Sequence, residues 1–312
     1  MPTTPATDSA KRALLEHLID DAGLFPPAAL PMDRALRAHL RHAESAYAWT
    51  GGTFVVPASR IGELADRRDP SRPLTLSVIL DAAMGAKGDT VRADLDRVGR
   101  AALEGATVAS VELRTLAALD AAGLGRAVAS VAAHYPGQTT GFFYEAPYAA
   151  GWPVAPGDIF AALVDARAAA PAGVTLGAKL RCGGPAPGAT PSSEDVAAFL
   201  TAAQTHGIPW KATAGLHHPV RGIYEGSMMH GFLNVFVAAV ALHAGVLDAA
   251  RVVDVIAEED PRAFLVDPMH VGWREVRVDA DAVAAARAHA MSFGSCSFDE
   301  PVNGLRELGL LL

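Results

Sequence analysis

The sequence predicts a single α/β domain, an eight-stranded parallel (β/α)8 TIM barrel. Short runs rich in β-branched residues alternate with alanine-rich segments of helical period, which is the pattern of repeated strand–helix units around a parallel sheet. Charged residues recur near the ends of these runs, one for each unit. An open doubly wound sheet is the alternative fold. Such sheets commonly carry a glycine-rich phosphate loop after the first strand, whereas Phe25-Pro26-Pro27 stands at that place here.

The chain has 312 residues, of which 51% are hydrophobic and 19% are charged. This composition indicates a folded protein with a sizeable core rather than a disordered chain. Barrels of alternating strands and helices commonly reach about 250 residues as one domain. We therefore expect residues 1–312 to form one barrel domain, with residues 1–12 flexible and residues 268–312 forming a C-terminal extension.

The strands and several helices can be placed from the periodicity of the sequence. The predicted strands span residues 18–25, 53–56, 74–81, 108–114, 140–147, 174–181 and 209–217, and an eighth is expected at 263–267. Late helices are predicted at residues 230–245, 251–259 and 279–291. The start of another helix is indicated by Thr190-Pro191-Ser192, followed by Glu194 and Asp195, because acidic residues favour the first turn. Gly207 is typical of a helix end.

The overall charge and the cysteine content exclude several classes of protein. A net charge of −8 and a pI near 5.7 leave no basic face for a nucleic-acid backbone. The two cysteines, Cys182 and Cys296, cannot build a disulfide framework or a four-cysteine zinc site. No apolar run reaches the roughly 18 residues of a membrane span, and the first residues are too polar for a signal peptide. We expect a cytoplasmic protein without nucleic-acid or membrane partners.

Five charged residues recur near the carboxyl ends of the predicted strands. They are separated by 31, 33, 34 and 32 residues: Asp81, Glu112, Glu145, Lys179 and Lys211. In a parallel barrel the carboxyl ends of all strands meet at one rim, where the active sites of such barrels lie. The spacing therefore predicts that the five side chains converge at one end of the barrel.

Side-chain alternation predicts which neighbours share the inner face with these charges, because residues two apart on a strand point the same way. The intervening apolar residues would pack against the outer helices. The predicted inner neighbours are Ser110, Arg114, Arg181, Thr213, Gly215 and His217. A different interpretation is a ring of mutually paired charges without catalytic function, since buried charge is costly unless it is paired.

Two lysines on adjacent strands beside carboxylates are the components of a Schiff-base enzyme. An amine attacks a carbonyl only when it is unprotonated, and the pKa of a free lysine is about 10.4. Burial or a neighbouring cation shifts the balance toward the neutral amine. One lysine would then be the nucleophile and the other its electrostatic activator, while Glu112 or Glu145 transfers protons during cleavage of a carbon–carbon bond.

Three segments together resemble the 2-deoxyribose-5-phosphate aldolase family of class I aldolases. They are Lys179-Leu-Arg-Cys-Gly-Gly, Thr190-Pro-Ser-Ser-Glu-Asp and Lys211-Ala-Thr-Ala-Gly. Members of that family are eight-stranded barrels with a Schiff-base lysine on strand six and a second lysine on strand seven. The resemblance implies that Lys179 forms the imine and that Lys211 lowers its pKa.

Three features depart from the pattern of that family. Glu112 stands in place of the family's aspartate on strand four, Lys211 is followed by Leu216-His217-His218-Pro219, and the chain is longer. The family's substrate therefore does not carry over to this chain.

The substrate is expected to be a small carbonyl compound, phosphorylated or carboxylated, and no cofactor is expected. Gly183 and Gly184 offer backbone amides to an anion, and arginines bind carboxylates or phosphates through two-point contacts. His217 is a candidate catalytic acid or base, and His218 is a candidate substrate contact. The remaining candidates for substrate binding are Asp81, Arg114, Arg181 and Thr213.

Two metal-dependent alternatives remain open. Asp81, Glu112 and Glu145 would lie on strands three, four and five, and such oxygen ligands suit Mg²⁺. This arrangement is similar to the enolase superfamily and would make a lyase or isomerase. Alternatively, His217 with His230 and a carboxylate could bind Zn²⁺.

A non-catalytic, ligand-binding barrel is the third class of function. A structure in which both lysine amines are paired with carboxylates, with no cavity above them, would favour it. A homodimer is also predicted, because Tyr148, Trp152 and Pro153 stand in an expected loop and residues 308–312 form an apolar tail.

Overall fold

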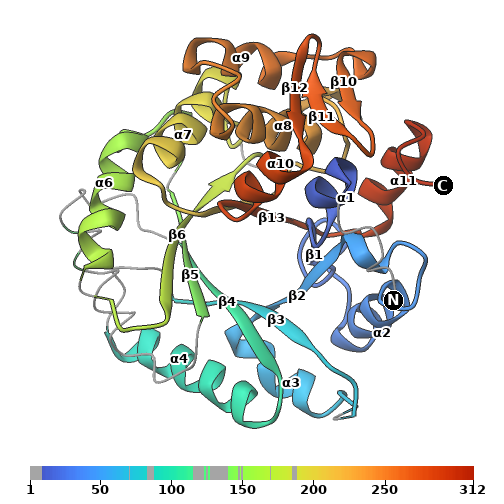
Figure 1. The fold of residues 1–312 in the computed structure, drawn as a ribbon. Helices are drawn as coiled ribbons and strands as arrows, with labels where there is room; N and C mark the ends of the chain where they lie inside the picture. The colour runs from blue at the N-terminus through green and yellow to red at the C-terminus, as the bar shows by residue number, and fades with distance from the viewer. Residues whose placement is uncertain are drawn as a thin grey trace, which may run out of the picture.

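Eight parallel strands close a barrel in the part of the chain that the structure, a computed structural model, describes (Figure 1). The described residues are 9–69, 71–82, 88–114, 123, 126, 140–146, 148, 150–168, 170–184 and 188–312. Around the barrel the strands are β1 (Ile19–Asp21), β2 (Gly51–Pro57), β3 (Thr75–Ile79), β4 (Thr107–Arg114), β5 (Thr140–Glu145), β6 (Val174–Arg181), β7 (Trp210–Thr213) and β13 (Ala290–Ser295). Because β13 pairs with both β7 and β1, the predicted barrel is confirmed and the open sheet is excluded.

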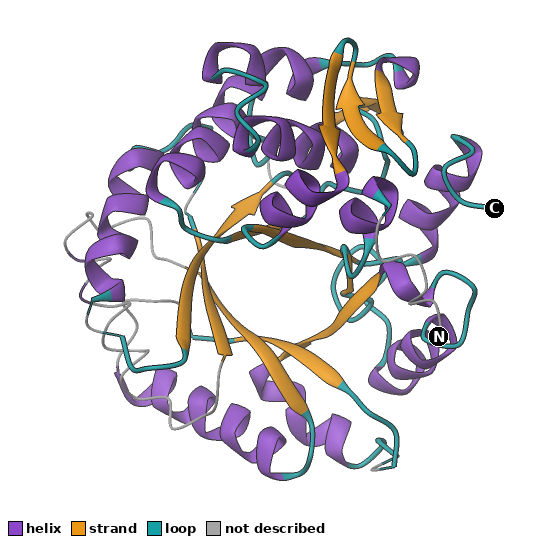
Figure 2. Cartoon of the chain, in the orientation of Figure 1, coloured by secondary structure: helices purple, strands orange, loops and turns teal. Residues whose placement is uncertain are grey.

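Helices surround the barrel and cover its outer face (Figure 2). The α-helices are α1 (Ala10–Leu15), α2 (Met32–His42), α3 (Ile61–Ala65), α4 (Gly88–Leu103), α6 (Pro156–Arg167), α7 (Ser193–His206), α8 (Phe232–His243), α9 (Ala249–Ala257), α10 (Ala280–Arg287) and α11 (Asp299–Glu307). The described residues also form three short 3-10 helices, η1 (Ala48–Thr50), η2 (Ala58–Arg60) and η3 (Pro261–Ala263). No helix in the described residues combines the length and apolar character that crossing a bilayer requires.

The ends of α7 follow directly from its sequence. The Ser192 hydroxyl accepts a hydrogen bond from the backbone N–H of Asp195, and the Asp195 carboxylate accepts one from the N–H of Ser192. This reciprocal capping box satisfies two N–H groups that the first helical turn leaves open. The helix ends at Gly207, whose φ of 57° lies in the left-handed region that glycine adopts without strain. Both predicted ends of this helix are confirmed.

The eighth barrel strand differs from the prediction. Residues 263–267 contain β10 (Phe264–Val266), which forms an antiparallel sheet outside the barrel with β11 (His270–Trp273) and β12 (Val276–Asp279). β13 closes the barrel instead, although its residues were expected in a helix and in a C-terminal extension. The strand reads Ala290-Met-Ser-Phe-Gly-Ser and contains no β-branched residue, so that strand propensity does not reveal it.

β1 and β7 are less than half as long as predicted. β1 covers only three residues of the predicted strand 18–25, and β7 ends at Thr213 within the predicted strand 209–217. After β7 the backbone turns at Ala214 and Gly215, both of which have positive φ. A hairpin of β8 (Gly222–Tyr224) and β9 (Ser227–Met229) follows before α8. Pro147, predicted as the end of the fifth strand, lies outside the described residues.

The described N-terminal residues are held against the rest of the chain. Residues 1–8 lie outside the described part, whereas residues 10–12, expected to be flexible, belong to α1. The Ala10 N–H donates a hydrogen bond to the Pro268 carbonyl at 2.9 Å, and Ser9 caps the helix by accepting from the N–H of Arg12. Residues 10–12 are therefore a fixed part of the fold rather than flexible, as was expected of them.

The apolar features that predicted a homodimer pack within the chain only in part. Leu311 is buried, and the Leu312 carbonyl accepts a hydrogen bond from the Tyr47 hydroxyl. The Trp152 ring stacks on Phe199 at a centroid distance of 6.0 Å. Leu308 and Leu312 are exposed, and the homodimer stays a prediction.

The ring of Phe143 forms the floor beneath the polar side chains of the barrel. Phe143 is fully buried on β5, and Gly177 on β6 leaves room for its ring, since a Cβ at Gly177 would lie 2.5 Å from a ring carbon. Lys211 Nζ lies 5.6 Å from the ring centroid. Val111 and Leu113 are buried on the opposite face of β4, as the alternation predicted.

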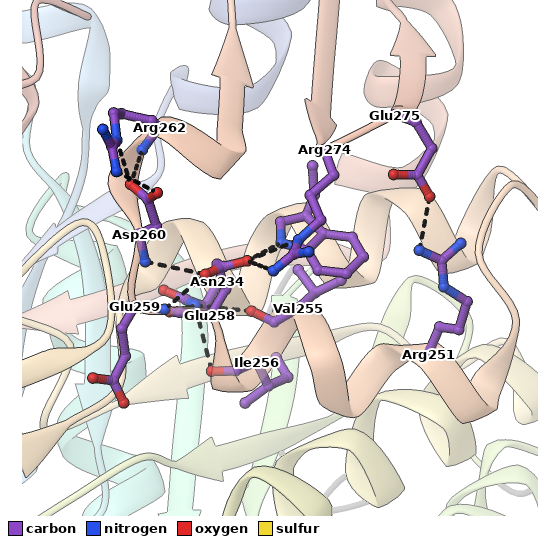
Figure 3. A network of polar contacts seen from close by, with 11 residues as sticks. Asn234, Arg251, Val255, Ile256, Glu258, Glu259, Asp260, Arg262, Arg274 and Glu275 are labelled. Carbon is purple, nitrogen blue, oxygen red and sulfur yellow. Dashed lines mark hydrogen bonds and ion pairs between the residues drawn. The ribbon is translucent and has the colours of Figure 1, made fainter.

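Asn234 of α8 ties that helix to the end of α9 (Figure 3). Its side chain is fully buried, and its Nδ2 donates to the carbonyls of Val255 and Glu258, each at 2.8 Å. Its Oδ1 accepts from the N–H of Arg221 at 2.8 Å. The Glu258 carboxylate in turn accepts from Arg274 at 2.8 Å, which extends the network to the turn between β11 and β12. One buried amide thus connects α8, α9 and the loop after β7.

Replacing Asn234 should destabilise the protein because the substitution leaves buried backbone groups without partners. We expect Asn234→Ala to lower the free energy of unfolding by about 2–3 kcal/mol, measured by urea denaturation. The matched control is Asn303→Ala on the exposed face of α11, which should stay within about 0.5 kcal/mol of the wild type. Equal effects of the two substitutions would contradict the role given to Asn234.

Candidate active site

Glu112 binds two lysines in the interior of the barrel. Glu112 Oε2 lies 2.5 Å from Lys179 Nζ, and Glu112 Oε1 lies 2.7 Å from Lys211 Nζ. Lys179 and Lys211 are paired in register on β6 and β7, so both side chains point to the same face of the sheet. The three residues are each less than 5% exposed: Glu112 3%, Lys179 3% and Lys211 4%. One carboxylate therefore carries an ammonium group on each of its oxygens.

Asp20 of β1 is a second anion for Lys211. Its Oδ2 lies 2.9 Å from Lys211 Nζ and accepts a hydrogen bond from the Ser292 hydroxyl at 2.7 Å. Its Oδ1 accepts from the N–H and the hydroxyl of Thr53 at 2.7 and 2.9 Å. Asp20 was missed in the sequence analysis. An acidic residue inside the predicted first strand, next to Leu18 and Ile19, was the signal that could have found it.

Two serines complete the surroundings of Lys211. Its ammonium group donates to the hydroxyls of Ser77 and Ser110, each at 3.3 Å. The Ser110 hydroxyl donates to Ser77 Oγ, and the Ser77 hydroxyl donates to Glu112 Oε1, both at 2.6 Å. Ser110 was expected on this face, whereas Ser77 was not singled out. Lys211 is therefore surrounded by two carboxylates and two hydroxyls.

The electrostatics of this cluster keep Lys211 and Glu112 charged. Burial alone would lower the pKa of Lys211, but Asp20 and Glu112 raise it above the usual range of a lysine. Burial would likewise raise the pKa of Glu112, yet Lys179 and Lys211 hold it well below its usual range. Lys211 is consequently a fixed cation at neutral pH, and Glu112 is a fixed anion.

Glu145 and Arg181 extend the cluster toward the carboxyl end of the strands. Glu145 Oε2 lies 3.5 Å from Lys179 Nζ, and Glu145 Oε1 accepts from Arg181 Nε at 2.8 Å. The Arg181 side chain is 31% exposed, whereas that of Lys179 is 4% exposed. Three cations (Lys179, Lys211 and Arg181) thus face three carboxylates (Asp20, Glu112 and Glu145). Of the five charges predicted to converge, the structure brings four together.

Asp81 does not join the other charges. It is exposed, and its carboxylate accepts from the N–H and the hydroxyl of Ser59 at 2.6 and 2.9 Å. The register explains this, because the β3 residue opposite Glu112 is Ile79, and Asp81 lies two residues beyond it. In the described part of the chain, Asp81, Glu112 and Glu145 do not bring their oxygens within metal-binding range of one another. The hypothesis of a Mg²⁺ site on these three carboxylates is therefore withdrawn.

The other predicted substrate contacts lie near the ends of β4, β6 and β7. Arg114 is exposed at the end of β4, and Thr213 is partly buried in register with Arg181. Gly183 allows the loops after β6 and β7 to touch, since a Cβ there would lie 2.9 Å from the Gly215 Cα. Gly184 follows in the same loop. Their position suits contact with a ligand at the carboxyl end of the barrel, and their role stays a prediction.

The predicted histidines lie apart from one another. His217 Nδ1 lies 2.9 Å from Glu300 Oε2, and hydrogen bonds to Cys296 and Glu300 raise the pKa of His217 to about 9, against the effect of burial. His218 stacks on the Tyr224 ring at a centroid distance of 3.5 Å, and burial lowers its pKa. His230 Nε2 is bound to the Pro191 carbonyl at 2.8 Å. The structure thus does not place His217 and His230 in a common zinc site.

Cys182 is a packing residue. It is fully buried at the end of β6, and burial raises the pKa of its thiol to about 12. The thiol therefore stays protonated at neutral pH and is a poor nucleophile.

Comparisons with known proteins show a weak structural resemblance to aldolase-type barrels. No protein-family model and no curated protein matches the chain. Among solved structures, deoxyribose phosphate aldolase from Aeropyrum pernix, a tetramer, aligns with a TM-score of 0.48 and 14% identity, over 98% of this chain and 100% of that chain. A monomeric dihydrodipicolinate synthase variant aligns with a TM-score of 0.37 and 13% identity, over 97% and 99% of the two chains.

Removing the charge of Glu112 should destabilise the barrel strongly, because two buried ammonium groups lose a counter-ion. We expect Glu112→Gln to lower the free energy of unfolding by about 3–5 kcal/mol, measured by urea denaturation at pH 7. The matched control is Glu104→Gln on the surface, with an expected change within about 0.5 kcal/mol. If Glu112→Gln also changed the free energy of unfolding by no more than about 0.5 kcal/mol, the buried ion pairs would not stabilise the barrel as described.

The effect of Glu112→Gln should also depend on pH. Because folding lowers the pKa of Glu112, its charge stabilises the protein fully above its ordinary pKa of 4.5 and progressively less as the pH falls below that value. The stability difference between wild type and variant should therefore be smaller at about pH 4 than at pH 7. A difference that grows on acidification would contradict the lowered pKa.

Proposed function

We propose that this protein is a lyase of the class I aldolase type, which binds a small carbonyl substrate as a Schiff base on Lys179. One observation carries the proposal: two buried lysines on adjacent strands share a single carboxylate, and one of them, Lys211, is also bound by a second carboxylate and two hydroxyls. Such a pair provides a reactive amine next to a fixed positive charge.

Lys179 is the better candidate for the nucleophile. The Lys211 amine is bound by Asp20, Glu112 and two serine hydroxyls, and its raised pKa keeps it protonated. The Lys179 amine contacts Glu112 and, at the longer distance of 3.5 Å, Glu145. Glu145 also pairs with the partly exposed Arg181. Glu112 therefore connects Lys179 to the enclosed Lys211, and Glu145 connects it to the partly exposed Arg181.

The carboxylates divide the remaining tasks. Glu112 is held ionised by both lysines and serves to position them. Glu145 is the group offered for proton transfer, because it contacts Lys179 on one side and the accessible Arg181 on the other. Arg181 and Arg114 are the cations that would bind a carboxylate or phosphate of the substrate.

The proposed reaction begins when Lys179 gives up a proton to Glu145 and its neutral amine adds to the substrate carbonyl. Loss of water then leaves an iminium ion. Cleavage of the carbon–carbon bond sends its electron pair to the iminium, which becomes an enamine, while the β-hydroxyl proton passes to a carboxylate and an aldehyde leaves. Protonation of the enamine and addition of water release the second product and restore the amine.

Borohydride trapping tests the proposal, since it reduces an iminium ion to a stable secondary amine. With a panel of small aldehydes and keto acids, we expect at least one compound to leave a covalent adduct on the peptide that contains Lys179. The assignment by mass spectrometry is simple because the chain has four lysines, Lys11, Lys87, Lys179 and Lys211. Since the chemistry uses no cofactor, EDTA should not prevent the adduct.

Matched variants decide which lysine reacts. Lys179→Arg should abolish the adduct while it keeps a positive charge beside Glu112, and Lys11→Arg should leave the adduct unchanged. An adduct on Lys211, or none with the whole panel, would refute the assignment.

A ligand-binding barrel is the second candidate function, and one observation favours it: both lysine amines are already paired with carboxylates. Charges that satisfy one another can hold a ligand without reacting with it. In that case, compounds from the same panel should raise the thermal unfolding midpoint, while borohydride leaves no adduct.

A further inference from the structure

His217, Cys296 and Glu300 form a second group of reactive side chains, separate from the lysine–carboxylate cluster. His217 lies in the loop after β7, Cys296 directly follows β13, and Glu300 lies in the first turn of α11. One ligand atom of each residue lies within 4.8 Å of the other two, and His217 Nδ1 is 2.9 Å from Glu300 Oε2. Among the described residues, no other three histidine, cysteine or acidic side chains bring their ligand atoms this close together.

The surrounding backbone presents the three side chains from well-packed elements. Ser295 in β13 pairs with Asp21 of β1, which places the start of the following turn. In that turn the Ser295 hydroxyl donates to the Ser297 carbonyl at 2.6 Å, and the N–H of Glu300 donates to Ser297 Oγ at 3.3 Å. These bonds link the end of β13 to the first turn of α11.

α11 also packs closely on the loop that carries His217. A Cβ at Gly304 would lie 2.5 Å from the Pro219 side chain, so the helix and the loop meet where only glycine fits. Val302 and Leu305 of α11 are buried. The relative positions of His217 and Glu300 therefore follow from the fold rather than from a flexible surface contact.

The chemistry of the three side chains favours a cation of borderline softness. A thiol and a carboxylate, both negative when ionised, stand on either side of an imidazole. Zn²⁺ accepts thiolate, imidazole and carboxylate ligands together, whereas Mg²⁺ and Ca²⁺ require oxygen ligands. The side chains of His217 and Glu300 are 20% and 52% exposed, so an ion can reach them from solvent.

We propose that His217, Cys296 and Glu300 form a three-ligand site for Zn²⁺ on the carboxyl side of the barrel, between β7 and β13. Three protein ligands leave a fourth tetrahedral position for water or for an anionic ligand, as in open zinc sites. Binding replaces the protons of the imidazole and the thiol by the metal, and these protons pass to the solvent. The site does not depend on the lysine chemistry proposed above.

Titration of the metal-free full-length protein with Co²⁺ tests this site, since a cobalt–thiolate bond gives a charge-transfer band in the near ultraviolet. We expect one equivalent of Co²⁺ to bind, with the band present in the wild type and displaced by Zn²⁺. Cys296→Ala should abolish the band, and His217→Ala and Glu300→Gln should each weaken Zn²⁺ binding at least about tenfold. The matched control, Cys182→Ala, should keep both the band and the affinity.

A chemical measurement gives a second readout. Alkylation of Cys296 by iodoacetamide should slow at least about tenfold when Zn²⁺ is bound, because a metal-bound thiolate is a poor nucleophile toward the reagent. Absence of the cobalt–thiolate band in the wild type, an undiminished band in Cys296→Ala, or alkylation indifferent to Zn²⁺ would each overturn the proposal. Borohydride trapping on Lys179 is independent of these outcomes.

Discussion

A buried carboxylate shared by two buried ammonium groups is the interaction on which the interior of this barrel depends. A charge in a protein interior is tolerated only with a partner, and Glu112 supplies one for both Lys179 and Lys211. Asp20 and Glu145 balance the remaining positive charge, which includes that of Arg181. Because these residues come from β1, β4, β5, β6 and β7, the ion pairs also couple the strands across the barrel.

The two lysines have different surroundings, so that the two sides of the cluster differ chemically. Lys211 lies above the ring of Phe143 and is enclosed by acceptors, whereas Lys179 adjoins the pair of Glu145 and Arg181 toward the carboxyl end. We therefore expect Lys179 to react with the substrate, while Lys211 remains a fixed positive charge beside it. His217, Cys296 and Glu300 add a chemically different group between the ends of β7 and β13. The same end of the barrel thus carries amine, carboxylate and thiol chemistry.

Much of this arrangement could be predicted from the sequence because two periods act together. One strand–helix unit of 31 to 34 residues returns the chain to the same rim, and the two-residue alternation selects the inner face. These periods predicted Glu112, Glu145, Lys179 and Lys211. They failed for Asp81, which lies two residues beyond Ile79, the β3 residue paired with Glu112. They also failed for Asp20, whose strand has only three residues. β13 contains no β-branched residue, so its sequence does not predict a strand. Glu300 belongs to a helix far from His217 in sequence, so the sequence does not predict that the two side chains meet.

The shared ion pair can be tested most directly by following the Glu112 side chain itself. Carbon-13 NMR of its carboxyl carbon, assigned with a variant at that position, reports its ionisation as the pH is lowered from 7. If both lysines bind it, the resonance keeps the shift of an ionised carboxylate until acid unfolds the protein. A titration in the folded protein with an ordinary midpoint near 4.5, the usual pKa of a glutamate, would contradict the account.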